Sequence, residues 1–422
     1  MHSVSKYIHI HNLDDDSLLN IFNLCRPNVI GEDEYGVVIQ WSNWAQERWW
    51  YQLVKVCRRW RYLILGSASH LGLCLVCTRG TPVADMLTHS PPLPLIIDHD
   101  DEHHDLTAED EEGIMFALQH RDRVRCIDLV IPGPSLQKVI QAVDGPFPML
   151  ECLHFAPPTK YDGLVLPSTF EAPRLRMIVL YHFASPIGSP LLTTAVSLVC
   201  LTLRWIHSSI DVYPNHLFQA LSRLPQLQNF TIIFSSPIPN REIERQLLRM
   251  PIITHITFPN LLFISIRGVS AYLEALLSHM NAPLLNKLEV TLFNQLSFSV
   301  PHLRQFMTTT EIIRSSTVEF FFYHKEVVML MFYPSSQLIT LCIRVGCHHL
   351  DWQVSSVTQI SNVLGPLSPP WWISPLTIGA IHYRQSGTIK LTAPSGANFS
   401  DHSGMWRPFG FTMASLGSSL VV

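Results

Sequence analysis

The stretch Pro148-Met149-Leu150-Glu151-Cys152-Leu153-His154-Phe155 contains a pattern that runs through most of the chain. We call this pattern the apolar frame: a hydrophobic residue, two others, a second hydrophobic residue, one other, and a third. The frame occurs nine times, as Val124/Ile127/Leu129, Leu150/Leu153/Phe155, Leu175/Ile178/Leu180, Leu198/Leu201/Leu203, Leu227/Phe230/Ile232, Leu261/Ile264/Ile266, Leu285/Leu288/Val290, Val318/Phe321/Tyr323 and Leu338/Leu341/Ile343. Because strand side chains alternate between faces, the second and third positions share one face. We therefore expect nine strand segments with a common buried face.

The frames recur at a spacing of about 27 residues, with intervals from 20 to 34. This spacing is close to the period of leucine-rich repeats, about 20 to 29 residues. A proline, whose fixed φ suits a turn into a strand, often stands two residues before the first apolar position. Five of the nine units have it, at Pro148, Pro173, Pro225, Pro259 and Pro283.

Stretches with helical spacing separate many of the frames. They are Leu136/Val139/Ile140/Val143, Leu217/Phe218/Leu221/Leu224, Leu273/Leu276/Leu277/Met280 and Leu303/Phe306/Met307. A doubly wound α/β sheet would also alternate strands and helices, but such sheets seldom contain nine strands in units of similar length. We therefore predict an α/β fold in which an irregular leucine-rich-repeat-like solenoid forms a curved parallel sheet, and this sheet is the expected binding surface.

Two apolar segments precede this array. In the first, Leu13–Leu24, Asp14 is predicted to cap a helix, because its carboxylate can accept from unpaired N–H groups. Leu13 and Leu18 then have the spacing of a hydrophobic staple. One face of this helix is expected to carry Leu18, Phe22 and Cys25.

The second segment, Trp49–Leu65, predicts another amphipathic helix. Its apolar side is expected to carry Leu53, Val56, Cys57, Trp60 and Ile64. The basic residues Arg58, Arg59 and Arg61 lie towards its polar sides.

Together, L-x-x-D-x-L-L-x-I-F from Leu13 and V-C-R-R-W-R-x-L from Val56 resemble the F-box, which docks on the adaptor of a cullin-type (SCF) ubiquitin ligase. The chain departs from that motif at Asp14, where most members have proline, and in an insertion at 26–47 that separates the two halves. The resemblance implies a set of adaptor-binding residues: Leu13, Leu18, Leu19, Ile21, Phe22, Leu53, Val56, Cys57 and Trp60.

Residues from Trp49 through 71–78 and 91–95 are further similar to the large family of F-box-like proteins of mushroom-forming fungi, and the similarity covers about residues 10 to 365. We predict an F-box-like helical domain at 10–70, a solenoid at 71–365, and an unassigned or poorly ordered tail at 366–422. The first part of the solenoid is expected to contain strands at 71–77 and 93–98, a loop at 98–105 and a helix from a capping box at Thr107 through Leu118.

Composition limits the classes of partner. The 422 residues include 15% charged and 47% hydrophobic residues with a formal net charge of −4, which argues against nucleic acid as the main partner. The sequence contains no run of about eighteen apolar residues and no signal-peptide pattern, so we expect a cytoplasmic or nuclear protein without membrane association. Nine cysteines, an odd number, indicate reduced thiols.

Several side-chain groups have spacings that occur in metal or redox sites. Cys74 and Cys77 are separated by two residues, but on a strand they point to opposite faces, and no second pair completes four ligands. The acidic, His-containing loop at 99–105 and the run 347–349 are more typical of solvated loops. No nucleotide-binding, hydrolase or zinc-protease motif occurs, so we predict no catalytic, cofactor or metal residue and no enzymatic activity.

The sequence thus predicts the substrate-recognition subunit of a cullin-type ubiquitin ligase. Its helical head would bind the ligase adaptor, and through it a cullin, while its sheet would bind an unknown protein substrate. The alternative is a leucine-rich-repeat-like scaffold for protein interactions without a ubiquitin-ligase role, favoured by Asp14 and by the split motif.

Overall fold

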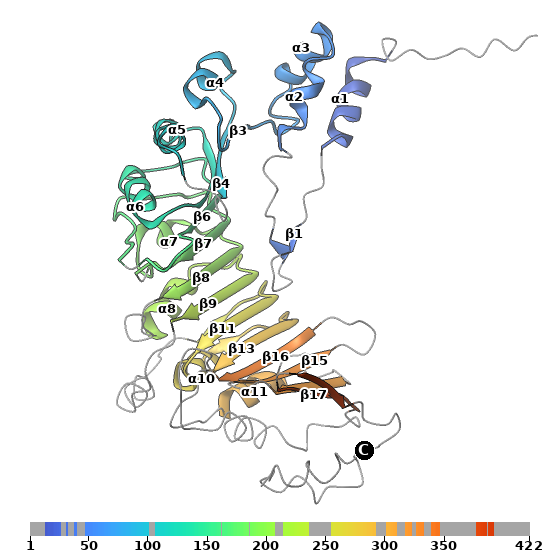
Figure 1. Ribbon diagram of the computed structural model, residues 1–422, viewed down its shortest axis with the longest axis vertical. Coiled ribbons are helices and arrows are strands. Elements are labelled where there is room, and N and C mark those ends of the chain that lie inside the picture. Colours follow the sequence, from blue (N-terminus) through green and yellow to red (C-terminus); the bar gives the residue numbers. More distant parts are fainter. Residues whose placement is uncertain are drawn as a thin grey trace, which may run out of the picture. The chain divides into compact units, whose positions relative to one another are not determined.

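The computed structural model describes residues 13–26, 31–32, 38–39, 47–100, 106–161, 163–184, 186–206, 214–235, 255–292, 301–309, 317–322, 326–332, 339–346, 377–385 and 387–391. The chain forms two compact units, Met1–Leu180 and Tyr181–Val422. It is a mixed α/β protein with a large, mostly parallel sheet (Figure 1). The predicted α/β class is therefore confirmed at this level.

The first unit begins with three helices. These are α1 (Asp15–Leu24), α2 (Trp50–Leu53) and α3 (Arg58–Gly66). Asp14 caps α1 as predicted, since its Oδ1 accepts from the backbone N–H of Ser17 at 2.7 Å. Between α1 and α2, β1 (Gly31–Glu32) and β2 (Val38–Ile39) form an antiparallel pair.

The prediction of one continuous helix over Trp49–Leu65 is wrong. Cys57 has extended backbone angles, φ −157° and ψ 170°, and acts as the N-cap of α3. Its Sγ accepts from the backbone N–H of Trp60 at 3.5 Å. The spacing of apolar residues does not reveal such a break, because the residues before and after Cys57 keep the same helical period.

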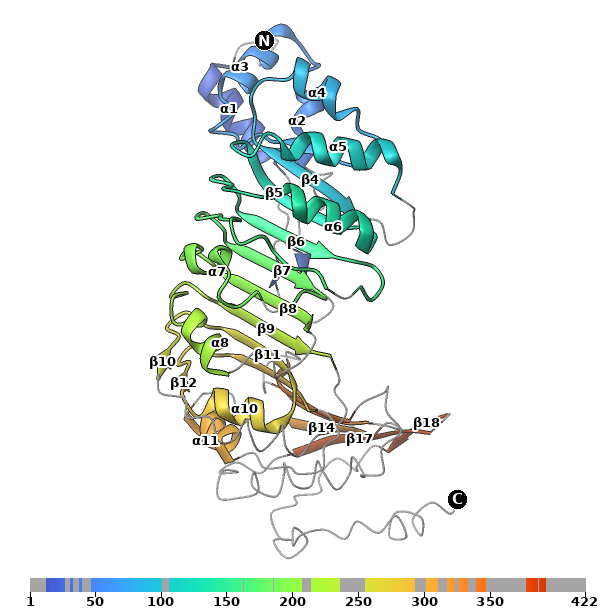
Figure 2. The same cartoon turned by 90° about the vertical axis from the view of Figure 1, so that its left-hand side faces the viewer.

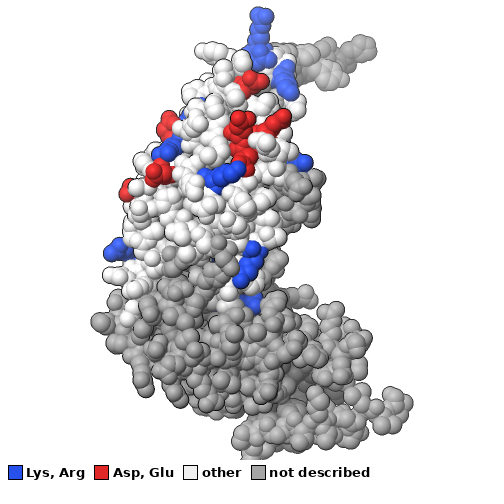
Figure 3. Space-filling view, turned by 60° about the vertical axis from the view of Figure 1, so that its left-hand side comes forward, with Lys and Arg blue, Asp and Glu red and all other residues white. Residues whose placement is uncertain are grey.

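Five parallel strands follow, hydrogen-bonded in sequence order. They are β3 (Leu75–Cys77), β4 (Leu95–Asp100), β5 (Val124–Val130), β6 (Cys152–Ala156) and β7 (Met177–Tyr181). The helices α4 (Val83–His89), α5 (Ala108–Leu118) and α6 (Gly133–Ala142) lie on one face of these strands (Figure 2). On that side acidic and basic side chains occur close together (Figure 3), and Lys138 of α6 pairs with Glu111 of α5 at 2.5 Å.

Two local predictions in this unit need correction. The predicted loop at 98–105 begins too early, because Asp98, His99 and Asp100 continue β4 and pair with Asp128, Leu129 and Val130. The strand predicted over 71–77 starts only at Leu75, since a turn with Gly72 at φ +62° precedes it. Residues 101–105 lie outside the described part of the chain.

The predicted helix start at Thr107 is confirmed, and the Asp110 carboxylate also bonds beyond the helix. Thr107 Oγ1 accepts from the backbone N–H of Asp110 at 3.1 Å and donates to its Oδ2 at 2.7 Å. Asp110 Oδ1 accepts from the backbone N–H of Gly80 at 2.7 Å. Burial raises the pKa of this carboxyl, but the hydrogen bonds from Thr107 and Gly80 bring the pKa below its ordinary value. One carboxylate therefore holds the start of α5 to the turn after β3.

The second unit has another run of parallel strands: β8 (Cys200–Ile206), β9 (Asn229–Phe234), β11 (Phe263–Gly268), β13 (Lys287–Leu292) and β16 (Ile339–Gly346). The described helices of this unit are α7 (Pro190–Thr194), α8 (Pro214–Leu221), α10 (Ser270–Leu277) and α11 (Pro301–Thr309). A short parallel pair joins β10 (Ile256–Thr257) to β12 (Met280–Asn281). The helices α8 and α10 lie over one face of the neighbouring strands (Figure 2).

The apolar frame sets the strand register in both units. In the first, the second frame positions Ile127, Leu153 and Ile178 are paired partners. In the second, the paired partners at this level are Leu201, Phe230, Ile264, Leu288 and Leu341. The predicted burial of the first frame positions is confirmed, since each is at most 2% exposed: Val124, Leu150, Leu175, Leu227, Leu261 and Leu285.

The frame at Val318 does not continue the parallel run. Its strand β14 (Thr317–Phe322) is antiparallel to β15 (Glu326–Phe332), and β15 is antiparallel to β16. The frame at Leu338 instead follows the frame at Leu285 directly, because β16 pairs parallel with β13. Two further strands, β17 (Thr377–Gln385) and β18 (Gly387–Leu391), lie in the region for which no element was expected. The eighth frame, at Val318, therefore lies on a strand of the antiparallel pair β14 and β15 and is not the next parallel strand after β13.

Candidate functional site

The first candidate surface is the helical head, α1 to α3. Leu18 and Phe22 are fully buried and form its core, and the ring of Phe22 meets Trp60 edge to face at 4.8 Å. Arg59 of α3 donates to Asp15 Oδ1 at 2.6 Å and to the backbone oxygen of Leu13 at 2.7 Å. The two halves of the split motif are thus in contact despite the insertion between them.

The predicted adaptor-binding residues divide by exposure. Leu18 and Phe22 are buried inside the head. Intermediate exposure is found at Leu13, Leu19, Leu53, Cys57 and Trp60. Ile21 and Val56 are exposed, 37% and 59%.

Two exposed apolar side chains of the head were absent from the prediction. Leu24 is 84% exposed and Tyr62 is 82% exposed. Leu24 lies three residues after Ile21 on α1, so the two side chains share a face. This spacing was visible in the sequence and could have added Leu24 to the predicted set.

Arg48 and the first residue of α2, Trp50, bind the open edge of the sheet. β3 is the last strand at that edge, and Leu75 points its backbone N–H to Pro94 on the β4 side. The carbonyl oxygens of the alternate residues Cys74 and Val76 accept hydrogen bonds from side chains. Trp50 Nε1 donates to the oxygen of Cys74 at 3.3 Å, and Arg48 Nη2 donates to that of Val76 at 3.0 Å. An edge strand with satisfied carbonyls is a poor template for another strand, and here the caps also tie the head to the sheet.

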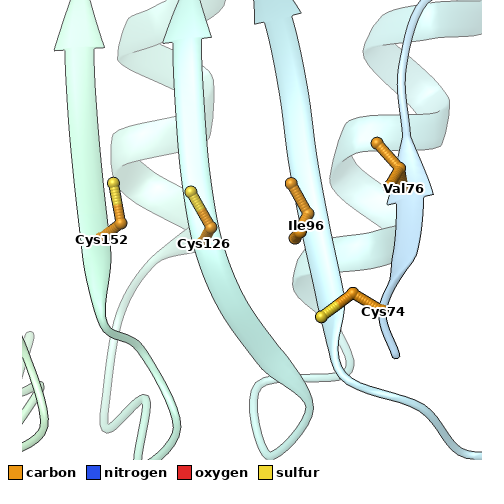
Figure 4. Packing of buried hydrophobic residues seen from close by; sticks show 5 residues of the cluster. All are labelled: Cys74, Val76, Ile96, Cys126 and Cys152. Atoms are coloured by element: carbon orange, nitrogen blue, oxygen red, sulfur yellow. The ribbon is translucent and has the colours of Figure 1, made fainter. Parts of the chain in front are cut away.

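The face of the first unit opposite its helices has an apolar centre. Its members are Cys74, Val76, Ile96, Cys126 and Cys152 (Figure 4). Burial raises the pKa of the Cys74 thiol even though Arg125 Nη1 lies 3.6 Å from the sulfur. Cys77, on the alternate side of β3, has its pKa raised to about 12 by burial. These thiols are protonated near neutral pH and behave as small apolar side chains.

One residue pair on that face is ionisable. His154 Nδ1 lies 2.7 Å from Asp128 Oδ1, and Asp98 is the register partner of Asp128 on the neighbouring strand. Within the described residues, no group of three or more His, Cys, Asp or Glu side chains is arranged to hold a metal ion. His103, His104 and the run 347–349 lie outside these residues.

The second unit holds an aromatic and basic cluster of Tyr181, His182, Arg204, Trp205 and Arg267. The rings of His182 and Trp205 stack with an interplanar angle of 12° and a centroid distance of 6.2 Å. Arg267 Cζ lies 5.0 Å from the Trp205 ring, and Arg204 Cζ lies 5.4 Å from the ring of Tyr181.

This cluster contains backbone strain. Among the described residues, His182 and Trp205 are the non-glycine residues with positive φ, 63° and 58°. Bulky residues rarely adopt this conformation, which costs on the order of 1 to 3 kcal/mol and concentrates at functional sites. The prediction from sequence missed the cluster, although arginine directly after the third frame position marks it at Arg204 and Arg267.

No protein-family model, no curated protein and no solved structure matches the chain. In the described part of the chain, none of the helices is long and apolar enough to cross a membrane.

Proposed function

We propose that the chain is an F-box-like substrate receptor of a cullin-type ubiquitin ligase. In this proposal α1 to α3 form the F-box head, and the frame-bearing strands form a leucine-rich-repeat-like solenoid. The head binds the ligase adaptor, and the sheet binds the protein to be ubiquitinated. The chain contributes no catalytic residue and acts by holding substrate near the transferring enzyme, which raises its effective concentration.

The observation that carries the proposal is the construction of the head. Arg59 and Trp60 bring the second half of the motif onto α1, through Asp15 and Phe22. With Leu18 and Phe22 committed to this core, the apolar contacts left for a partner are exposed ones: Ile21, Leu24, Val56 and Tyr62. Exposed apolar residues on a small helical domain can serve as contacts for a protein partner.

The arrangement of the strands in each unit supports the second half of the proposal. Described helices cover one face of the strands in each unit (Figure 2), and the frame residues fill the core on that side. On the other face of the second unit the alternate positions are mostly polar. Lys287 pairs there with Glu289 at 3.0 Å and lies over the ring of Phe263 at 5.2 Å. Polar and aromatic residues on a regular sheet suit the recognition of a protein surface.

The proposal is tested by co-expressing the tagged full chain with the ligase adaptor and a cullin, followed by capture on the tag. Retention of both proteins is expected. If neither protein is retained while the chain itself is folded, the receptor function is rejected and the scaffold without a ligase role takes its place.

A further inference from the structure

One row of register positions in the first unit carries sulfur on three neighbouring strands. Cys126 of β5 is the paired partner of Cys152 of β6, and Cys152 is the partner of Met177 of β7. Because paired residues of a parallel sheet present their side chains to the same face, we call these three residues the sulfur row. The row was not predicted from the sequence, because its members come from three successive frames and form no short motif.

The two thiols of the sulfur row are packed together in apolar surroundings. Cys126 is 2% exposed and Cys152 is 6% exposed, and Figure 4 shows their sulfur atoms at the same level of neighbouring strands. Burial raises the pKa of the Cys126 thiol, and so does the hydrogen bond that it shares with the Cys152 thiol. Met177 packs against the same cluster and is partly exposed, so the row reaches solvent at this residue.

The spacing of the two thiols suits a metal ion with two ligands. Neighbouring strands lie about 4.8 Å apart. A bond from a metal ion to a thiolate is about 2.3 Å long in zinc sites, so two thiolates on opposite sides of one ion stand about 4.6 Å apart. Cys126 and Cys152 could therefore hold an ion between them with little movement of β5 and β6. Linear binding by two thiolates is a geometry that Cu(I) adopts, and thiolate and thioether ligands both favour this soft ion.

Other occupants fit the pair less well. Structural zinc requires four ligands, and in the described part of the chain no three His, Cys, Asp or Glu side chains are grouped to hold a metal ion. Magnesium and calcium require oxygen ligands. A disulfide needs Cβ atoms about 3.8 Å apart, which is closer than the spacing of neighbouring strands. The pair therefore favours a soft ion that needs only two strong ligands.

We propose that Cys126 and Cys152 bind one Cu(I) ion as thiolates, with the thioether of Met177 as a third and weaker ligand. The ion replaces the two thiol protons, which pass to solvent, so binding consumes no oxidant or reductant. The product is one ion held by two thiolates, with one net negative charge. This site goes beyond the proposed receptor function and is independent of adaptor binding by the head. Because the site is specific for a soft monovalent ion, a chelator of divalent ions does not test it.

The test uses the full chain without oxygen, and Cu(I) is supplied as its coloured complex with bathocuproine disulfonate. Transfer of one ion per chain is expected and is measured as loss of the colour. Losing an outer-shell partner of a metal site costs about 10- to 100-fold in affinity, so Cys126→Ser and Cys152→Ser, which each remove a ligand, should weaken binding at least about 100-fold. Met177→Leu removes the thioether at similar volume and should weaken binding about tenfold.

Matched variants keep the test specific to the sulfur row. Cys25→Ser removes an exposed thiol after α1, and Cys77→Ser removes a buried thiol on the alternate side of β3 from Val76. Both should bind Cu(I) as the unmodified chain does. Thermal unfolding without copper shows whether each variant is folded. Saturating Cu(I) should raise the unfolding temperature of the unmodified chain but not that of Cys152→Ser, because a ligand that binds only the folded state stabilises it.

X-ray absorption of the unmodified chain loaded with Cu(I) gives a test that does not depend on the folding of any variant. The expected spectrum shows sulfur neighbours at about 2.3 Å and no nitrogen or oxygen neighbours. Three outcomes would overturn the inference: no transfer of Cu(I) to the chain, equal affinity of the unmodified chain and a folded Cys152→Ser variant, or a spectrum with nitrogen neighbours from histidine.

Discussion

Arg59 and Asp15 join the two halves of the helical head, with 2.6 Å between Nη2 and Oδ1. Both side chains are partly exposed, 38% and 57%, so solvent screens much of their attraction. The hydrogen bond from Arg59 to Leu13 adds to the pair, yet the apolar contact of Phe22 with Trp60 should dominate the stability of the head.

We therefore predict that Arg59→Ala lowers the free energy of unfolding of the head by only about 1 kcal/mol. Phe22→Ala, which empties a fully buried position, should cost about 3 to 5 kcal/mol. Native-state hydrogen exchange at the backbone N–H groups of α1 and α3 measures both. A larger loss for Arg59→Ala than for Phe22→Ala would show that charge rather than burial holds the head together.

A second prediction uses adjacent leucines that differ in burial. Leu261 is a first frame position and is 0% exposed, whereas Leu262 is 36% exposed. Leu261→Ala should cost about 2 to 5 kcal/mol, and Leu262→Ala should remain within about 0.5 kcal/mol. Denaturant titration of the two variants compares the same chemical change at neighbouring positions. Equal losses would mean that the apolar frame does not mark the core.

A third prediction concerns a buried carboxyl group in the second unit. Glu274 of α10 is 3% exposed and accepts from the backbone N–H groups of His302 and Leu303, at 2.5 and 2.9 Å, at the start of α11. The ordinary pKa of glutamate is 4.5, and burial raises the pKa of Glu274 to about 7 although the two hydrogen bonds oppose this shift.

The raised pKa of Glu274 makes the stability of the folded chain depend on pH. The folded state binds the proton more tightly than the unfolded state, so the contribution is full below pH 4.5 and is lost as pH rises through about 7. The loss is on the order of 3 kcal/mol. Glu274→Gln, which does not titrate, should remove this slope. The free energy of unfolding is measured between pH 5 and 8 for both chains. The same dependence on pH in Glu274→Gln would contradict the account.

A fourth prediction concerns the thiols. Cys74 and Cys77 are at most 1% exposed with raised pKa values, so a thiol reagent at neutral pH should modify them only after unfolding. The exposed Cys25 is the internal control and should react in the native state. Chelator and reductant should leave the unfolding temperature unchanged. A fall of several degrees with chelator would indicate a metal site among the residues near His103.

Local features of this fold could be predicted from the sequence because they depend on neighbouring residues. Asp14 caps α1 through the N–H of Ser17, three residues away, and the apolar frame at Leu153 or Phe230 needs only the alternation of a half-buried strand. Strand order in the sheet does not appear in such a pattern. The frame at Val318 therefore looked like its neighbours although β15 lies between its strand and β16.

The candidate sites were less predictable for related reasons. Motif similarity named Leu18 and Phe22 as adaptor contacts, but a one-dimensional motif does not separate residues that build the head from residues on its surface. The break at Cys57 depends on a single sulfur contact to the backbone of Trp60. The positive φ of Trp205 has no signature in residue type, because tertiary contacts impose it.

The central claim is that the head binds the ligase adaptor, and the most direct test is the affinity of purified adaptor for the purified full chain. Leu24→Asp places a charge on the most exposed apolar residue of α1, and Asn23→Asp adds the same charge to the neighbouring exposed position as a control. The account predicts that the unmodified chain and Asn23→Asp bind adaptor equally, and that Leu24→Asp binds at least about tenfold more weakly. Absence of binding by the unmodified chain, or equal binding by Leu24→Asp, would contradict it.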